Sequence, residues 1–297
     1  MSKTSLAIRG PFDLGELAMM GFGHRDERSF DGVMRMAFCL DGDYERQVGV
    51  AARQRDGDCL DLEVDAAGAE LTDDELAAVD RQVARVLSLD HDGQAFHELC
   101  LADPALAAVH AVAPGFRPAL FYSPYEAAVW SIISARRARA QGITLRTRLS
   151  EHAGQVFDVA GSPTWSIPTP SRLLEVDEFP GLPSDRIPRL HAVARAATEG
   201  RLSAEALRAL PPDEAKAELQ QLPGIGPFYS ALVVIRACGH ADVLSPEESR
   251  SRDAIREIYG IDHDPSDAEL AALAESWRPF RTWVTVMLRA LSGRRPA

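Results

Sequence analysis

The first 70 residues predict antiparallel β-strands, because short apolar runs alternate with turn residues. The runs cover 33–40, 47–54 and 59–64. Asp41-Gly42-Asp43 separates the first two runs, and Asp56-Gly57 before the third carries the signature of a β-hairpin. We therefore expect three or four antiparallel strands in this part of the chain.

From Thr72 onward the hydrophobic period becomes helical. Thr72 to Glu75 has the sequence of a capping box. The apolar positions after it recur every three or four residues: Leu76, Val79, Val83, Val86 and Leu87. Everything after Thr72 is therefore predicted to be helical.

Further helix signals continue toward the C-terminus. Ser123 to Glu126 forms a second capping box with Pro124 at the first helical position, and the helices it opens extend toward Gly154. Beyond a Pro/Ser-rich break at 161–171, short helices are expected near 171–177, 186–199, 203–209 and 213–221. The pattern predicts an α+β protein with a small β-rich N-terminal part and a larger, mainly helical part.

The length of 297 residues is typical of two or three domains. The net charge is −12, but the charges are not spread evenly along the chain. Residues 1–113 hold 22 acidic and 10 basic side chains, whereas residues 114–297 hold 22 of each. The last two thirds are thus the part that can meet a polyanion. An alternative makes the acidic first third a protein-interaction module, but we predict no particular protein partner.

Several classes of protein are not expected. The four cysteines, at 39, 59, 100 and 238, form no C-x-x-C pair, and the histidines form no H-x-x-x-H, so no metal site is predicted. No apolar run approaches the roughly 18 residues of a membrane span. The N-terminus lacks the apolar stretch of a signal peptide. We therefore expect a cytoplasmic protein without a membrane partner.

Residues 213–239 carry the most specific motif. Leu222-Pro223-Gly224-Ile225-Gly226-Pro227 is a tight turn between two helical segments. The two glycines allow positive φ angles and a close backbone approach, and the second helix directs free N–H groups toward the turn. We predict a helix-hairpin-helix that binds the DNA backbone through Pro223, Gly224, Ile225 and Gly226. An ordinary αα-hairpin is the alternative.

This hairpin, with the acidic segment 242–250 downstream, resembles the helix-hairpin-helix DNA glycosylases, especially bacterial 3-methyladenine DNA glycosylase II. The likeness covers nearly the whole chain, including 167–173 and 277–281. It implies a β-rich domain followed by a helical glycosylase fold in two parts. The implied domains are 1–92, then 93–123 together with 241–297, and 124–240 with the hairpin. It also implies base-excision repair of double-stranded DNA, with an alkylated base flipped into a cleft.

The resemblance implies a catalytic carboxylate. The family uses an aspartate to stabilise the positive charge that develops on the deoxyribose, and Glu248 occupies its position. Ser245 to Glu248 is also a capping box, so Glu248 as a helix cap alone is the competing interpretation. If Glu248 has no catalytic role, Glu247 and Asp253 are the alternative candidates for the catalytic carboxylate.

The resemblance also assigns a base pocket and a wedge. Phe228 would stack on the flipped base, with a core position as its alternative, and Leu232 and Arg289 replace two aromatic residues of the family. Arg136 or Arg137 would fill the vacated stack or contact a phosphate. The alternative for this pair, with the neighbouring Arg139, is a solvated helix face.

Lysine is nearly absent, since Lys3 and Lys216 are the only two. Glycosylases that also nick the strand use a lysine just after the hairpin, where Phe228 stands here. A monofunctional N-glycosylase without AP-lyase activity is therefore expected. It needs no cofactor, although the resemblance implies a monovalent cation at the hairpin carbonyls. The alternative is a catalytically weak or inactive DNA- or damage-binding protein of the same fold.

Overall fold

The N-terminal part is a four-stranded antiparallel sheet. The computed structural model describes residues 1–20, 22–23, 29–55, 58–244 and 249–291. The strand order is β1 (Ser2–Ala7), β4 (Cys59–Asp65), β3 (Asp43–Arg55) and β2 (Met34–Leu40). The predicted antiparallel strands and the α+β class are confirmed. The first 70 residues also contain a short helix, α1 (Leu14–Met19), which the strand prediction missed.

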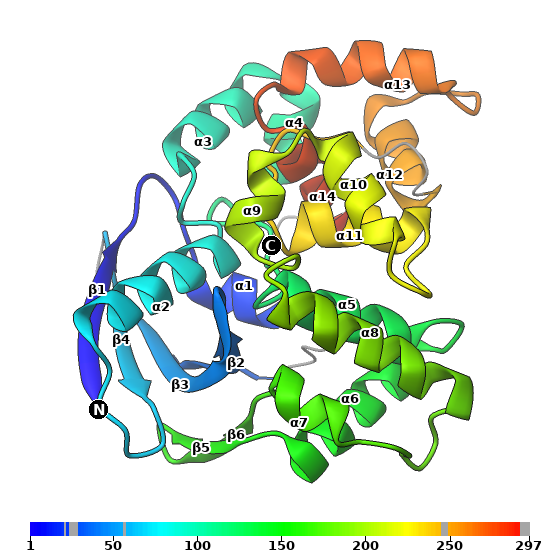
Figure 1. The fold of residues 1–297 in the computed structure, drawn as a ribbon. Coiled ribbons are helices and arrows are strands. Elements are labelled where there is room, and N and C mark those ends of the chain that lie inside the picture. Colours follow the sequence, from blue (N-terminus) through cyan, green and yellow to red (C-terminus); the bar gives the residue numbers. More distant parts are fainter. Residues whose placement is uncertain (21, 24–28, 56–57, 245–248, 292–297) are drawn as a thin grey trace.

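Helix α2 (Asp73–Val86) covers one face of this sheet (Figure 1). The predicted capping box is confirmed, because the Thr72 hydroxyl accepts from the Glu75 N–H at 3.2 Å and the Glu75 carboxylate accepts from the Thr72 N–H at 2.7 Å. Val79, Val83 and Val86 are buried against the sheet. The helix therefore begins and faces inward as its periodicity predicts.

A second hairpin corrects the expectation that everything after Thr72 is helical. β5 (Val156–Val159) and β6 (Ser162–Trp165) pair antiparallel around a turn in which Ala160 and Gly161 have φ of 50° and 77°. Phe157 and Val159 pack on Ala37 and Ala51, on the sheet face opposite α2. Strands of four residues show too little alternation to be recognised, and Pro163 argues against a strand.

The remainder of the described chain is helical. The four predicted short helices are confirmed within a few residues as α7, α8, α9 and α10. The helices are α3 (Gly93–Ala102), α4 (Pro104–His110), α5 (Pro124–Ser134), α6 (Arg139–Ala153), α7 (Pro170–Leu174), η1 (Ser184–Arg186), α8 (Ile187–Thr198), α9 (Ala204–Ala209), α10 (Pro212–Gln220), α11 (Pro227–Arg236), α12 (Ser249–Tyr259), α13 (Asp267–Ala274), η2 (Glu275–Trp277) and α14 (Arg281–Leu291).

The helices pack around two further cores. One is built mainly from α5 through α11. The other joins side chains of α3 and α4 to side chains of α12, α13 and α14, so it unites segments more than 100 residues apart. Figure 1 shows these helices together at the top of the molecule. The domain boundaries at 92, 123 and 240 remain a prediction.

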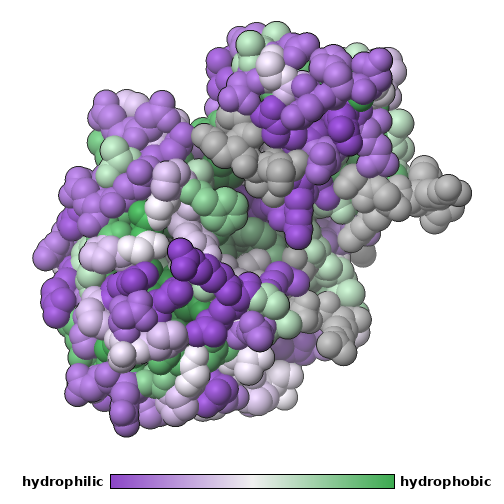
Figure 2. Space-filling view, turned by 90° about the vertical axis from the view of Figure 1, so that its right-hand side faces the viewer, coloured by the Kyte–Doolittle hydropathy of each residue, from purple (hydrophilic) through white to green (hydrophobic). Residues whose placement is uncertain are grey.

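The surface between these bodies is hollowed. Figure 2 views the molecule from the right-hand side of Figure 1 and shows hydrophobic surface, in green, inside a hollow between a lower and an upper body. Among the helices described, none has the length and apolar character needed to cross a membrane.

Candidate active site

The hairpin turn joins α10 to α11 and owes its shape to one glycine. Gly224 has φ of 93°, whereas Gly226 has φ of −92° and needs no special conformation. A Cβ on Gly224 would lie 2.9 Å from Ile132 Cδ1 and 3.0 Å from Arg189 Cδ. Of the two glycines that the sequence leaves free to adopt positive φ, only Gly224 therefore does so.

The other residues of the hairpin divide between the core and the surface. Ile225 is buried, and its N–H donates to the Leu222 carbonyl at 3.0 Å, so it anchors the turn. Pro223 and Gly224 are exposed. A Cβ on Gly226 would meet nothing within 4 Å. The exposed side of the turn thus leaves room for a ligand to approach the main chain.

Helix α11 begins at Pro227, one residue earlier than the sequence suggested, with Gly226 as its N-cap. The Ser230 N–H donates to the Gly226 carbonyl at 2.9 Å, which closes the first turn. The N–H groups of the first turn precede the helical ladder and point out of the N-terminus, where they favour an anion. Arg189 of α8 lies against this turn and was not found by sequence reasoning.

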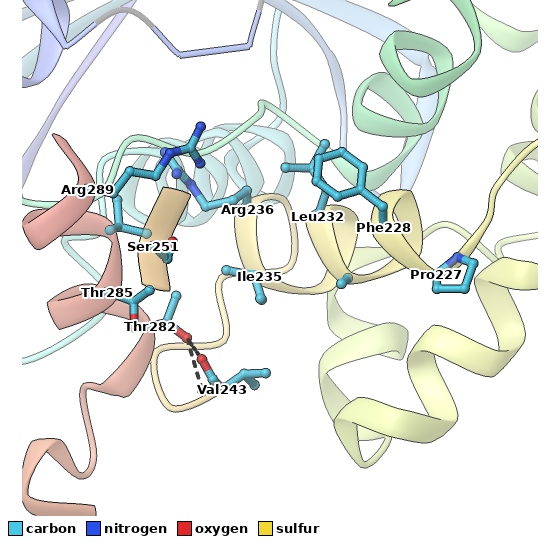
Figure 3. A pocket seen from close by; sticks show the side chains of 12 residues that line it. Pro227, Phe228, Leu232, Ile235, Arg236, Val243, Ser251, Thr282, Thr285 and Arg289 are labelled. Atoms are coloured by element: carbon cyan, nitrogen blue, oxygen red, sulfur yellow. Dashed lines mark hydrogen bonds between the residues drawn. The ribbon is translucent and has the colours of Figure 1, made fainter. Parts of the chain in front are cut away.

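A pocket of about 430 Å³ opens between α11 and α14 (Figure 3). It starts at the first turn of α11, immediately after the hairpin. Its lining residues are Pro227, Phe228, Ala231, Leu232, Ile235, Arg236, Val243, Ser251, Thr282, Thr285, Val286 and Arg289.

The structure brings the three sequence-assigned pocket residues together. Phe228 and Leu232 face the pocket from α11, and Arg289 faces it from α14 (Figure 3). Phe228 is 58% exposed, so it is not the core residue of the alternative interpretation. Its ring lies 5.3 Å from that of Tyr229 in an edge-to-face arrangement.

Several lining residues were missed, although a signal for them exists. Ala231, Leu232, Ile235 and Arg236 follow Phe228 at helical spacing, and Thr282, Thr285 and Val286 precede Arg289 in the same way. Extending the helical period from each assigned residue would have found both walls of the pocket.

Two arginines and no acidic residue belong to the described lining. Arg236 is 6% exposed and donates from Nη2 and Nε to the Ala119 carbonyl at 2.6 and 3.2 Å. Its guanidinium also lies 3.6 Å from the centre of the Phe22 ring. These contacts hold a fixed positive charge at the wall of an otherwise largely apolar pocket.

The chain that follows α11 is fastened to the start of α14. Asp242 forms ion pairs with Arg281 at 2.6 Å and with Arg278 at 2.8 Å. Next to it, Val243 is hydrogen-bonded to Thr282 (Figure 3). The position of the segment that enters the pocket is thereby set by α14.

The predicted catalytic Glu248 lies outside the described residues, as do Glu247 and the capping box 245–248. The pocket-lining Val243 and Ser251 come before and after this gap. Asp253, the remaining substitute, has a side chain 72% exposed, 4.0 Å from Arg256, and does not line the pocket.

The predicted wedge lies between α5 and α6. Arg136 is exposed and has φ of 58°, a left-handed conformation that is rare and unfavourable for a side chain of this size. Arg137 donates to the Gly181 carbonyl at 3.0 Å, and Arg139 donates to the Gly23 carbonyl at 3.2 Å. The structure thus separates the three arginines, with Arg136 displayed at the tip of the turn.

Within the described ranges, no cluster of three or more His, Cys, Asp or Glu side chains could hold a metal ion. The four cysteines are free thiols, and three of them are buried. Burial raises the pKa of the Cys100 thiol to about 12, which makes it inert as a nucleophile at neutral pH.

The arrangement of an N-terminal sheet, two helical bodies and a pocket behind a hairpin is the fold of the helix-hairpin-helix DNA glycosylases. A solved 3-methyladenine DNA glycosylase from Archaeoglobus fulgidus shares it with a TM-score of 0.76, 20% identity and coverage of 96% of this chain and 97% of that one. The chain is similar to the helix-hairpin-helix DNA glycosylases both in fold and in sequence.

Two curated relatives show the similarity at the level of sequence. "Probable bifunctional transcriptional activator/DNA repair enzyme AlkA" of Mycobacterium tuberculosis is 29% identical over 206 residues, 68% of this chain and 40% of the relative. "DNA-3-methyladenine glycosylase 2" of Escherichia coli is 26% identical over 203 residues, 66% of this chain and 67% of the relative. The match thus spans about two fifths of the length of the mycobacterial relative. No protein-family model matches the chain.

Proposed function

We propose that the protein is a monofunctional DNA N-glycosylase of base-excision repair, which flips alkylated bases out of duplex DNA and hydrolyses their N-glycosidic bonds. The observation that carries this proposal is the position of the pocket. It begins at Pro227 and Phe228, the first residues of the helix that follows the hairpin. A DNA backbone held at the hairpin would place a flipped base at the mouth of this pocket.

The hairpin would bind the backbone through its main chain. Pro223, Gly224 and Gly226 leave the N-terminus of α11 accessible, and that N-terminus favours a phosphate. Arg189, packed on Gly224, would add a positive charge beside it, partly balanced by its ion pair with Asp185 at 2.7 Å. Such contacts fix the position on DNA without reading its sequence.

Arg136 would act as the wedge or hold a phosphate of the distorted strand. Its exposed, left-handed position at the tip of a turn supports a functional role, because strained residues cluster at binding sites. Arg137 is half-buried and bound to the Gly181 carbonyl, so it would support the turn more than it enters the DNA.

Glu248 would stabilise the positive charge that develops on the deoxyribose and orient the attacking water. Support comes from its position in the sequence, between the pocket-lining Val243 and Ser251. Phe228, exposed at the pocket, would stack on the flipped base.

The proposal excludes AP-lyase chemistry, which needs an amine to form a Schiff base. Lys216 lies in α10 and pairs with Asp213 at 2.8 Å, and Lys3 lies in β1. Neither lines the pocket. Borohydride treatment during turnover should therefore trap no covalent protein–DNA adduct.

A monovalent cation at the hairpin is part of the same proposal. The oxygens of the turn 222–226 are uncharged main-chain carbonyls, which suit a hard cation of low charge rather than a transition metal. Replacing potassium chloride by choline chloride at equal ionic strength should weaken DNA binding if such a cation is used.

The deciding experiment measures base release from methylated duplex DNA, together with DNA affinity. Wild type should release bases, Glu248→Gln should lose release but keep affinity, and Asp253→Asn should behave as wild type because Asp253 lies away from the pocket. Release by Glu248→Gln at the wild-type rate would leave Glu248 as a helix cap only. Binding without release by wild type would favour a DNA-binding protein of the same fold.

A further inference from the structure

The turn that displays Arg136 has the geometry of a type II β-turn. Ala135 has φ of −54° and ψ of 128°, and Arg136 has φ of 58°. The Arg137 N–H donates to the Ser134 carbonyl at 3.1 Å, which closes the turn. The third residue of a type II turn requires a positive φ and is usually glycine. Rotating the peptide between Ala135 and Arg136 by half a turn would give a type I turn, in which Arg136 would have an ordinary negative φ.

Arg186, at the end of η1, supplies contacts that hold the less favourable form. Its Nη1 donates to the Ile132 carbonyl at 2.5 Å, and its Nη2 donates to the Ala135 carbonyl at 3.4 Å. The Ala135 carbonyl belongs to the peptide whose rotation would convert the turn, so it faces Arg186 in the type II form and would face away in type I. The planar guanidinium presents donors to both carbonyls at once. Arg186 therefore stabilises the conformation in which Arg136 is displayed.

The same stretch of chain also packs on the hairpin. Arg189 follows Arg186 by three residues, on the same side of the helix. A Cβ on Gly224 would lie 3.0 Å from Arg189 Cδ and 2.9 Å from Ile132 Cδ1. Ile132 thus gives its carbonyl to Arg186 and its side chain to the hairpin turn, and α5 and α8 lie side by side (Figure 1). The start of α8 connects the two loops by which the protein would hold DNA.

We propose that Arg186 is a positioning residue for base flipping, which keeps the turn 134–137 in its type II form so that Arg136 meets the duplex at a fixed place relative to the hairpin. The inference rests on the proposed glycosylase function and adds a residue to it. Extruding a base costs unstacking energy, which a wedge offsets by filling the vacated stack. A wedge does so only when it is held rigidly relative to the strand, and Arg186 joins it to the element that holds the strand.

The test is a double-mutant cycle. Single-turnover base release from methylated duplex DNA is measured for wild type, Arg186→Met, Arg136→Gly and the variant with both substitutions. Flipping is followed by the fluorescence of 2-aminopurine placed next to the damaged base, and affinity for undamaged duplex by anisotropy. The control is Arg46→Met. Arg46 is half-buried like Arg186 and donates to the Glu70 carbonyl at 2.7 Å, but it lies in β3 of the N-terminal sheet.

We expect Arg186→Met to lower the rate of base release about 10-fold or more, and to lower the 2-aminopurine signal, without changing the affinity for undamaged duplex. In the Arg136→Gly background the same substitution should cost about 2-fold or less, because Arg186 acts through Arg136. Arg46→Met should behave as wild type. Arg186→Lys should follow Arg186→Met, since its ammonium keeps the charge but lacks the planar pair of donors, and it replaces that variant if Arg186→Met does not fold.

Losses that add in the double variant would overturn the inference, since Arg186 would then act independently of Arg136. A loss of affinity for undamaged duplex equal to the loss of rate would overturn it too, because Arg186 would be a phosphate contact. If wild type releases no base, the proposed function fails and this inference fails with it. If wild type releases bases and the losses add, only this inference fails.

Discussion

Thr282 binds both main-chain polar groups of Val243. Its hydroxyl accepts from the Val243 N–H at 2.9 Å and donates to the Val243 carbonyl at 2.8 Å. The Thr282 N–H also donates to the Ala241 carbonyl at 2.8 Å. One residue at the start of α14 thus fixes the chain that leaves α11, five residues before Glu248. Through this contact, α14 both lines the pocket and holds the main chain of Val243 in place.

Replacing Thr282 by Val should therefore affect catalysis more than folding. The substitution keeps the shape but leaves two main-chain groups of Val243 without their partner, at a cost of about 1–3 kcal/mol in the free energy of unfolding. We expect base release to fall by roughly 10- to 100-fold, because a shift of about 1 Å at a catalytic group has an effect of that size.

The matched control is Thr285→Val, which removes another hydroxyl from the same pocket. The Thr285 hydroxyl donates to the Arg281 carbonyl within its own helix, so its loss releases no loop. Single-turnover kinetics and urea unfolding of both variants check this prediction. Equal losses of rate in the two variants would contradict the positioning role of Thr282.

The two hairpin glycines should respond differently to Ala. Gly224→Ala forces a Cβ against Ile132 at a positive φ, so it should destabilise the fold by about 1–2 kcal/mol. Gly226→Ala meets no protein atom and should cost at most about 1 kcal/mol through its N-cap position. If a phosphate approaches Gly226, the Ala variant should nevertheless lose DNA affinity several-fold, equally for damaged and undamaged duplexes. Fluorescence anisotropy checks this, and an unchanged affinity would place the DNA elsewhere.

Relief of backbone strain at Arg136 should separate stability from activity. Arg136→Gly removes a non-glycine residue from φ of 58° and should stabilise the fold by up to about 1 kcal/mol, while base release falls at least 10-fold. Ala160→Gly is the control, since it relieves φ of 50° in the β5–β6 turn away from the pocket. It should stabilise without changing base release. Full activity of Arg136→Gly would exclude Arg136 as wedge or phosphate contact.

The buried His110 should make the protein sensitive to mild acid. Burial, together with the neighbouring His97 at 2.8 Å, lowers the pKa of His110 from its usual 6.5 to about 4. Between pH 4 and pH 6.5, His110 is protonated in the unfolded chain but neutral in the folded chain. The free energy of unfolding therefore falls as the pH drops from 6.5 toward 4, and His110 does not affect it above pH 6.5. The loss amounts to about 1–3 kcal/mol.

Urea unfolding of wild type and His110→Gln at pH 7 and pH 5 measures this contribution. Carboxylates that titrate in the same range are common to both proteins, so the difference between the two pH dependences belongs to His110. The variant should lose less stability on acidification than wild type. Parallel losses would show that His110 does not titrate differently on folding.

Local sequence signals predicted the elements that a few neighbouring residues determine. The capping box at Thr72, the Pro-opened helix at Pro124 and the turn at Gly224 each depend on contacts within about one helical turn. The hairpin β5–β6 was missed because its strands are short and its stability comes from Phe157, which packs on the sheet. The close approach of Phe157 also requires Gly49, where a Cβ would lie 2.6 Å from the Phe157 Cβ.

The sequence by itself determined three features of this protein. The switch from strands to helices follows from the hydrophobic period, the hairpin from its turn residues, and the concentration of negative charge in residues 1–113 from the composition. Leu232 and Arg289 came from the family resemblance, not from any local pattern. Only the tertiary structure decided that α11 and α14 face each other across a pocket, that Arg236 is held at its wall and that Thr282 binds Val243. These relationships join residues about 40 to 120 positions apart, and packing between such distant segments leaves no periodic trace in either one.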